Sequence, residues 1–180
     1  MNKKLDISYL GHPILRTHCA DIIDISNKGF QQLIDDMIHT VKTVNGLGIA
    51  APQVYESKRI FIIASKPSVR YPNAPEMEPI AIINPIILNH SDETVKDWEG
   101  CLSIPGIRGL VPRYTSITVE FTDRTGKQIT KTFNDFVARI FQHEFDHLNG
   151  IVFLDRLDSN KDIITEMEYQ KIVSSNKMSE

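Results

Sequence analysis

Two histidines that lie four residues apart enclose a glutamate in the run HEFDH, from His143 to His147. On a helix each residue turns by about 100°, so four steps bring a side chain back to within about 40° of its starting direction. Both imidazoles can therefore bind one metal ion from a single face. Glu144 points elsewhere and is free to move protons for a water molecule at that metal. This H-E-x-x-H pattern is typical of metal-dependent hydrolases.

A catalytic site of this kind needs a third protein ligand and leaves a fourth position for water. In metzincin peptidases a third histidine follows the motif at a fixed spacing, and Phe153 occupies that position here. The metzincin interpretation therefore fails. Two other sources of a third protein ligand remain. Glu166 or Glu168 could serve as in gluzincin peptidases, and Cys101 lies upstream in the run EGCLS. Because a free cysteine is more often a buried core residue than a ligand, the pattern alone leaves both open.

Three short motifs follow one another along the chain. They read GLGIAAPQ from Gly46 to Gln53, EGCLS from Glu99 to Ser103, and QHEFDH from Gln142 to His147. The flanking runs are GHPILR at 11–16, AIINP at 81–85 and IPGIRGLVPR at 104–113. Together these segments resemble the peptide deformylase family, and the resemblance covers most of the chain.

The resemblance implies a role for each motif residue. Glu144 would be the general base and acid, and the Gln53 amide with the Leu102 backbone N–H would bind the developing oxyanion. The implied metal is iron(II), with zinc, nickel or cobalt as possible substitutes. The implied ligands are Cys101, His143 and His147.

The family's substrate is the N-formyl group on the initiator methionine of nascent polypeptides, which is released as formate. A formyl group is the smallest acyl group, so a tight site can admit it and reject larger amides. Arg139 lies where an apolar residue is expected near the methionine pocket. Position relative to the motifs predicts that Leu47, Trp98, Phe136 and Ile140 line this pocket. Gly48 and Gly100 are also predicted to bind the substrate.

Composition limits the other possibilities. A chain of 180 residues with 41% hydrophobic residues suits one domain, 1–180, with a loose tail from about 174. A net charge of -3 and a pI near 6.1 give no excess of positive charge that would favour nucleic-acid binding. No apolar run approaches the roughly 20 residues of a membrane helix, and the first residues lack a signal peptide's apolar stretch. We therefore expect a cytoplasmic monomer whose two cysteines, Cys19 and Cys101, form no disulfide.

Two rival functions differ in class. One is a gluzincin peptidase, and the other is a nonenzymatic module that binds nascent chains or the ribosome. For the deformylase itself, transient contact with the ribosome is expected as well. An intact Glu144 favours catalysis, because a binding module has no need of a general base.

The resemblance implies an α+β fold with mixed, largely antiparallel sheets around a central metal-binding helix. Hydrophobic periodicity predicts further helices near both ends. That central helix should begin at Asn134 or Asp135 and end at Asn149-Gly150. Glu99, Arg108 and Arg113 form either a network that orients the cysteine or simple surface pairs. The other predicted elements are a helix at 27–44 capped by Ser26 or Asn27, strands at 59–64, 81–88, 116–121 and 128–133, a turn at 123–126, a proline-rich loop at 66–79, and a final helix at 159–173 with Glu166 and Glu168 on its solvated face.

Overall fold

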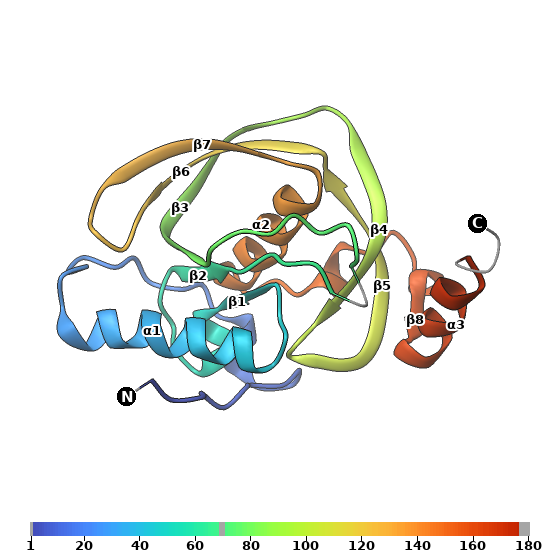
Figure 1. Ribbon diagram of the computed structural model, residues 1–180, viewed down its shortest axis with the longest axis horizontal. Coiled ribbons are helices and arrows are strands. Elements are labelled where there is room, and N and C mark those ends of the chain that lie inside the picture. The colour runs from blue at the N-terminus through green and yellow to red at the C-terminus, as the bar shows by residue number, and fades with distance from the viewer. Residues whose placement is uncertain (1, 69–70, 177–180) are drawn as a thin grey trace.

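The computed structural model describes residues 2–68 and 71–176. It contains two antiparallel sheets, with the helix α2 (Asp135–Leu148) between them (Figure 1). The fold is α+β, which confirms the predicted class. The five-stranded sheet has the order β1-β2-β3-β6-β7, and its strands are β1 (Gly48–Ala50), β2 (Ile60–Ile63), β3 (Ile80–His90), β6 (Ser116–Thr122) and β7 (Gln128–Asn134). The second sheet has the order β4-β5-β8, with β4 (Thr94–Cys101), β5 (Ile104–Tyr114) and β8 (Ile163–Thr165).

The first helix, α1 (Lys28–Thr43), covers the outer face of the five-stranded sheet. Asn27 caps it by accepting hydrogen bonds from the backbone N–H groups of Gly29 and Phe30. Its apolar side chains recur at helical spacing and pack against β2 in one buried cluster. The predicted helix and its cap are confirmed.

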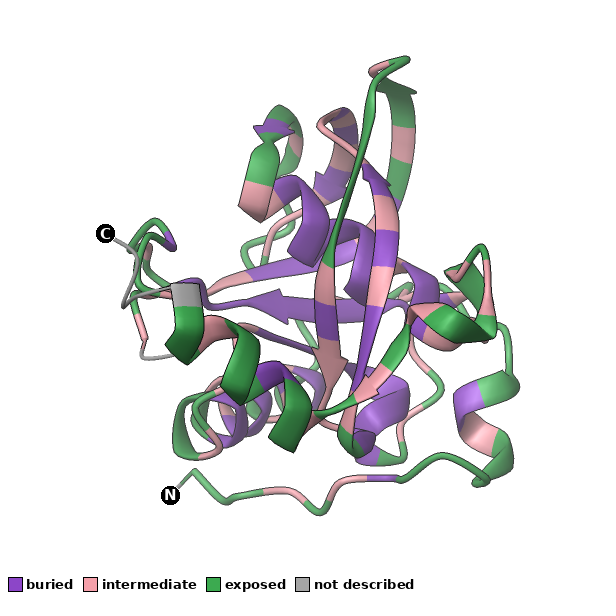
Figure 2. Cartoon of the chain, turned by 90° about the vertical axis from the view of Figure 1, so that its right-hand side faces the viewer, coloured by how far each residue is buried: buried purple, intermediate pink, exposed green. Residues whose placement is uncertain are grey.

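The helix α2 runs through the core, as its apolar faces predict. Phe141 is fully buried and meets Phe61 of β2 edge to face, with ring centroids 5.0 Å apart. Asn134 is the N-cap residue but makes no side-chain capping bond, and Gly150 follows the helix with a positive φ of 72°. Figure 2 shows that burial is concentrated on this helix and the strands around it. Cys19 also lies in this core as a free, buried thiol.

The predicted final helix is wrong in its first half. Residues 160–162 form a 3-10 turn, Ile163–Thr165 form β8, and only Glu166–Asn176 form the helix α3. The β-branched run Ile163-Ile164-Thr165 pairs with Ile107–Gly109 of β5, so sheet pairing overrides the helical pattern. Residues 174–176 of the predicted tail belong to α3, and 177–180 lie outside the described residues.

Three strands that form the site were absent from the prediction. The first half of β4 is exposed on both faces, β5 contains two prolines and two glycines, and β1 has only three residues. None of them shows a clear alternation of apolar and polar residues. In contrast, β2, β3, β6 and β7 lie where strands were predicted, and Asp123 to Gly126 form the turn between β6 and β7.

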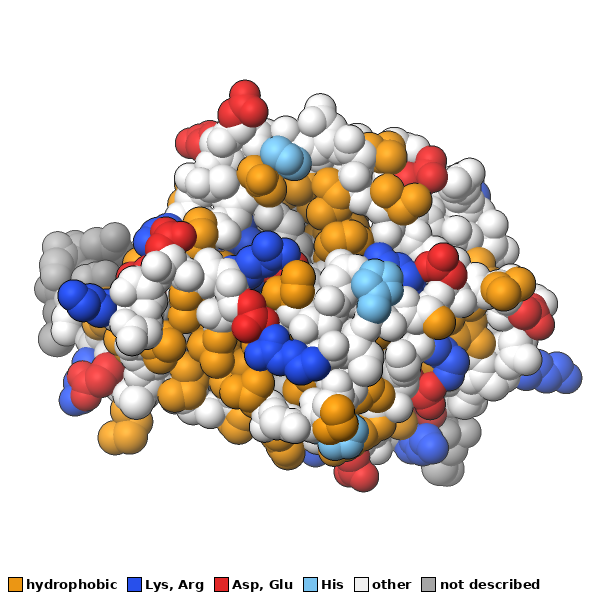
Figure 3. Space-filling view, turned by 180° about the vertical axis from the view of Figure 1, so that it is seen from behind, with side chains coloured by type: hydrophobic (Ala, Val, Ile, Leu, Met, Phe, Trp, Pro, Cys, Tyr) orange, Lys and Arg blue, Asp and Glu red, His pale blue; other side chains and the backbone are white. Residues whose placement is uncertain are grey.

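Short 3-10 turns cover Pro13–Arg16, Ala51–Val54 and Phe153–Arg156. The loop at 66–79 has no helix or strand among its described residues. Basic and acidic side chains are interspersed on the face in Figure 3. The described part of the chain includes no helix with the length and apolar character needed to cross a membrane.

Candidate active site

One face of α2 presents both histidines of the H-E-x-x-H motif. His143 and His147 are buried, and their ring centroids lie 5.2 Å apart. Phe153, which occupies the metzincin position, stacks on His143 with its ring centroid at 6.1 Å. Its side chain thus supports a ligand by packing.

Cys101 reaches the histidines from the end of β4. An irregularity in the β4–β5 pairing falls between Glu99 and Cys101, a position where a bulge can redirect side chains. The Cys101 sulfur lies 3.3 Å from His147 Nε2, and one ligand atom from each of Cys101, His143 and His147 lies within 4.8 Å of the others. Among the described residues this is the only such group, so the gluzincin assignment of Glu166 or Glu168 as third ligand is wrong.

Glu99 lies behind the ligands and fixes the His143 ring. Its carboxylate is 2.9 Å from His143 Nδ1, which leaves Nε2 toward the cysteine. Arg113 donates two hydrogen bonds to it, at 2.9 and 3.0 Å, and Arg139 donates one at 2.9 Å. Burial disfavours the carboxylate, but Arg113 and His143 outweigh this effect and keep the pKa of Glu99 well below its ordinary value.

The predicted network therefore includes Glu99 and Arg113 but not Arg108, which bonds to Glu166 and Tyr71 instead. Arg139, expected to disturb an apolar pocket, turns its guanidinium to Glu99 and to the carbonyl of Val111 at 2.8 Å.

Sequence reasoning missed the extension of this network through Asp146. Arg113 Nη1 donates to Asp146 at 2.6 Å, and Arg156 donates to the same carboxylate at 2.6 and 3.1 Å. Asp146 is a buried residue of α2 and directly precedes His147 in the chain. The only signal for this role in the sequence was the position of Asp146 inside H-E-x-x-H. Its partner Arg156 gave no signal, because that residue lies in a 3-10 turn outside the motif.

Glu144 is buried beside β1. A Cβ on Gly48 would lie 2.5 Å from Glu144 Oε1, so the carboxylate packs against the strand backbone. Burial raises the pKa of Glu144 to about 7. The Glu144 Oε2 atom is buried and has no hydrogen-bond partner among the described residues.

The Gln53 amide is oriented by the backbone around it. Gln53 Oε1 accepts a hydrogen bond from the Ala50 N–H at 2.8 Å, so its NH₂ group faces the cysteine loop. That group lies 3.4 Å from the Cys101 sulfur and 3.3 Å from Ser103 Oγ. Leu102 follows Cys101 in the tight turn between β4 and β5.

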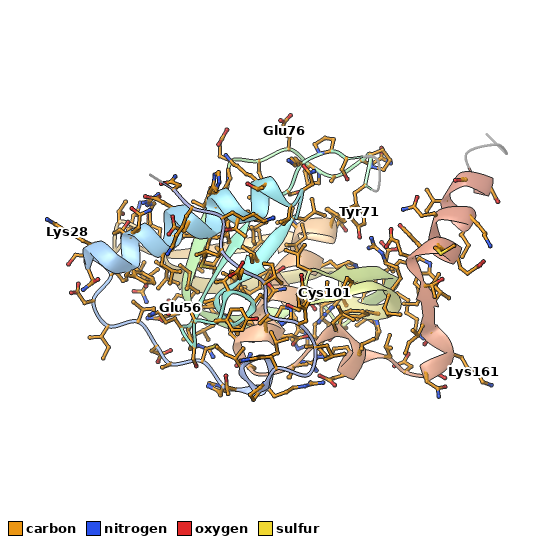
Figure 4. All side chains as sticks on the ribbon, turned by 90° about the horizontal axis from the view of Figure 1, so that it is seen from below. Lys28, Glu56, Tyr71, Glu76, Cys101 and Lys161 are labelled. Atoms are coloured by element: carbon orange, nitrogen blue, oxygen red, sulfur yellow. The ribbon has the colours of Figure 1, made fainter. Side chains whose placement is uncertain are left out.

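A cleft of about 750 Å³ opens onto the site. Figure 4 shows Cys101 near the middle of the molecule, with Tyr71 on the loop at 66–79. Tyr71, Arg139 and Glu166 also line the cleft, and none of these was predicted to bind substrate. The cleft brings together every residue predicted to bind the substrate, namely Leu47, Gly48, Trp98, Gly100, Phe136 and Ile140.

The donor set fits a divalent cation. A thiol and two imidazoles are typical ligands of transition metals. Burial, followed by the charges on His143 and Arg113, lowers the pKa of His147 well below its ordinary value, so its ring is neutral as a ligand must be. His147 Nδ1 has no hydrogen-bond partner among the described residues. An H-E-x-x-H helix with a cysteine beside it is typical of metal-dependent hydrolases, which indicates a hydrolase as the class of the protein.

Comparison with known proteins identifies the family. A model of the polypeptide deformylase family matches residues 4–162. Peptide deformylase 2 from Nostoc sp. is 59% identical over 172 residues, which cover 96% of each chain. The structure of the class I type b peptide deformylase from Acinetobacter baumannii with Met-Ala-Ser bound has a TM-score of 0.85 and 43% identity, covering 87% of this chain and all of that one. The structure of the peptide deformylase from Thermotoga maritima has a TM-score of 0.78 and 35% identity, covering 88% of this chain and 100% of that one.

The chain therefore belongs to the peptide deformylase family and is an enzyme. This confirms the resemblance and contradicts the nonenzymatic alternative.

Proposed function

We propose that this enzyme removes the N-formyl group from the initiator methionine of nascent polypeptides by a metal-dependent hydrolysis. Family membership supports deformylation of nascent peptides. The mechanism depends chiefly on one observation, the three ligand atoms within 4.8 Å beside a buried carboxylate. Met-Ala-Ser, bound in the Acinetobacter baumannii relative, is the tripeptide that remains when formyl-Met-Ala-Ser loses its formyl group, which supports this substrate class.

Cys101, His143 and His147 are the proposed metal ligands. A divalent ion there would lower the pKa of a bound water toward neutrality and polarise the formyl carbonyl. We propose iron(II) as the native ion, with zinc, nickel and cobalt as substitutes that suit the same donors. Burial lowers the pKa of His143, but hydrogen bonds with Cys101 and Glu99 outweigh it and raise that pKa, so metal binding should release a proton.

Glu144 is the proposed general base and acid. Its carboxylate accepts a proton from the attacking water and donates it to the leaving amine as the C–N bond breaks. A pKa of about 7, caused by burial, suits both steps near neutral pH. The contact with Gly48 holds the carboxylate in place.

Gln53 and Leu102 are the proposed oxyanion donors. The Ala50 N–H holds the Gln53 carbonyl oxygen, so the NH₂ group is oriented before substrate binds. Leu102 would contribute its backbone N–H from the turn beside Cys101. The methionine side chain would occupy the cleft between Leu47 and the α2 residues Phe136 and Ile140, with Gly48, Trp98 and Gly100 completing the wall.

Formate release from formyl-Met-Ala-Ser tests the proposal. Protein purified without oxygen, because a thiolate and iron(II) oxidise readily, should release formate, and Glu144→Ala should be slower by about 10²–10⁴-fold. Cys101→Ala should lose the metal, measured by elemental analysis, and Glu166→Ala should keep it. A metal-loaded wild type that releases no formate would contradict the proposal.

A cytoplasmic location, a monomeric state, a single domain and transient ribosome contact stay predictions. Ribosome cosedimentation and light scattering would test the contact and the oligomeric state.

A further inference from the structure

The chain before α1 contains a segment, residues 8–19, that contacts each of the three motif regions, and we call it the N-terminal strap. Its regular structure is limited to the 3-10 turn Pro13–Arg16 and an isolated bridge between His18 and Asn149. In Figure 1 the strap begins in the dark blue trace below α1. None of its residues has a role in the proposed reaction, so its contacts with the motifs need another explanation.

Ser8 of the strap binds the 3-10 turn that carries Gln53. Its backbone N–H donates to the Gln53 carbonyl at 2.8 Å, and its hydroxyl donates to the Pro52 carbonyl at 2.9 Å. Ser8 is fully buried and Gln53 is 1% exposed, so water cannot easily replace either bond. One residue therefore fixes two consecutive carbonyl groups of this turn.

Leu10 of the strap binds the loop that carries Cys101. Its backbone N–H donates to the Ser103 carbonyl at 2.9 Å, and Ser103 is fully buried. The hydroxyl of Ser103 in turn lies 3.3 Å from Gln53 Nε2. The hydrogen bonds thus form a closed ring that joins the strap, the Gln53 turn and the cysteine loop.

The far end of the strap is fixed to the end of α2. The Cys19 backbone N–H donates to the carbonyl of Leu148, the residue after the ligand His147, at 2.9 Å. A Cβ on Gly150 would lie 2.7 Å from the carbonyl carbon of Arg16, so the two backbones are in close contact. The strap is therefore anchored at both ends, and its first residues have little freedom to move.

We propose that Ser8 is a positioning residue for Gln53, and that the strap sets the place of the Gln53 amide relative to the cysteine loop. This inference rests on the proposed function, in which Gln53 is an oxyanion donor. Such a donor is effective only if its N–H group already lies where negative charge develops. The Ala50 N–H orients the Gln53 side chain, whereas Ser8 holds the backbone from which that side chain projects.

Ser8→Ala tests the proposal, because it removes the hydroxyl and keeps the backbone N–H. With formyl-Met-Ala-Ser, kcat should fall by about tenfold, the scale of one buried hydrogen bond. KM and metal content should stay unchanged. Gln53→Ala alone should lower kcat by about 10²–10³-fold. In that background, Ser8→Ala should cause no further loss, because the donor that Ser8 positions is already absent.

Thr40→Val is the matched control for a purely structural effect. The buried Thr40 hydroxyl holds the same end of the chain on α1, where it accepts a hydrogen bond from the Leu5 backbone N–H at 2.9 Å. This variant should lower the free energy of unfolding and leave kcat unchanged at a temperature where the protein is folded. If Thr40→Val lowers kcat as much as Ser8→Ala does, Ser8 has only a structural role and the proposal is overturned.

Three other results would also overturn the proposal. They are an unchanged kcat in Ser8→Ala, an unchanged kcat in Gln53→Ala, and a tenfold loss from Ser8→Ala that persists in the Gln53→Ala background. A metal-loaded wild type that releases no formate would instead reject the proposed function.

Ser8→Cys provides a second variant if Ser8→Ala does not fold. A thiol is a weaker donor than a hydroxyl, so kcat should fall by less than tenfold. A fall that disappears in the Gln53→Ala background supports the positioning role. The same fall in both backgrounds would overturn it.

Discussion

At the scale of single residues, one buried carboxylate orients His143, a proposed metal ligand. Glu99 contacts His143 directly and receives hydrogen bonds from Arg113 and Arg139. Each of these four residues is buried, so the charged groups among them need partners within the protein. The Glu99 carboxylate thus orients the His143 ring and accepts hydrogen bonds from two guanidinium groups at once.

Replacing Glu99 should damage metal binding and stability together. Glu99→Gln should weaken metal affinity by about 10–100-fold, because His143 loses the partner that orients its ring. It should also lower the free energy of unfolding by about 3–5 kcal/mol, since it leaves the buried Arg139 guanidinium without its carboxylate partner. Metal titration and urea unfolding measure the two effects. Glu93→Gln makes the same chemical change at an exposed position and should alter neither; an unchanged metal affinity in Glu99→Gln would contradict the orienting role.

The raised pKa of Glu144 predicts that the free energy of unfolding depends on pH. Its folded-state pKa of about 7 lies above the ordinary value near 4.5. Below about pH 4.5 the carboxyl is neutral in both states, and as the pH rises through 7 folding must bury a carboxylate, so stability is lost. In metal-free protein, Glu144→Gln should therefore be the more stable form at pH 8, by at most about 3 kcal/mol, with a smaller difference at pH 5. Urea unfolding of both proteins in chelator measures this. A difference that is the same at both pH values would show that the carboxyl is not responsible.

At the scale of elements, the site depends on the close approach of β1 to α2. The strand has only three residues and is an edge of its sheet, yet its backbone at Gly48 touches the Glu144 carboxylate. Only a residue without a side chain allows that approach. Packing against α2, the helix that carries Glu144, thus explains the glycine at position 48 of the glycine-rich motif.

Gly48→Ala tests this contact. The added methyl would lie 2.5 Å from Glu144 Oε1, so the carboxylate must move. A displacement of about 1 Å can reduce a rate by about 10²-fold, so formate release should fall by roughly that factor while the metal content stays normal. Gly29→Ala, at the start of α1 and far from the cleft, should leave the rate unchanged. Normal activity in Gly48→Ala would show that Glu144 does not depend on its contact with β1.

At the scale of the whole molecule, the proposed metal ligands come from two separate layers. Cys101 comes from the end of β4 in the three-stranded sheet, whereas His143 and His147 come from the central helix. An ion bound to all three should therefore stabilise the packing of the sheet against α2. An unfolded chain does not hold these ligands together.

Metal removal should therefore lower the melting temperature. For an ion at about 100 times its Kd, linkage gives about 2.7 kcal/mol of stabilisation. The melting temperature of the nickel-loaded protein, measured with and without chelator, gives this stabilisation. The melting temperature of Cys101→Ser should change little when nickel or chelator is added. Equal melting temperatures for wild-type protein with and without the ion would argue against a site that joins the layers.

The sequence by itself determined the family, the two long helices α1 and α2, and four of the strands. These features follow from local patterns: H-E-x-x-H spacing needs only one helical turn, and apolar periodicity needs only one element. Tertiary structure alone decided which partners the charged residues choose. Arg139 turned to Glu99, Arg108 turned to Glu166, and Asp146 joined Arg113 to Arg156. Each of these pairs joins separate elements, and β4, β5 and β8 are stabilised by pairing with one another rather than by their own patterns. Such choices depend on contacts between residues distant in the chain, which no local periodicity encodes.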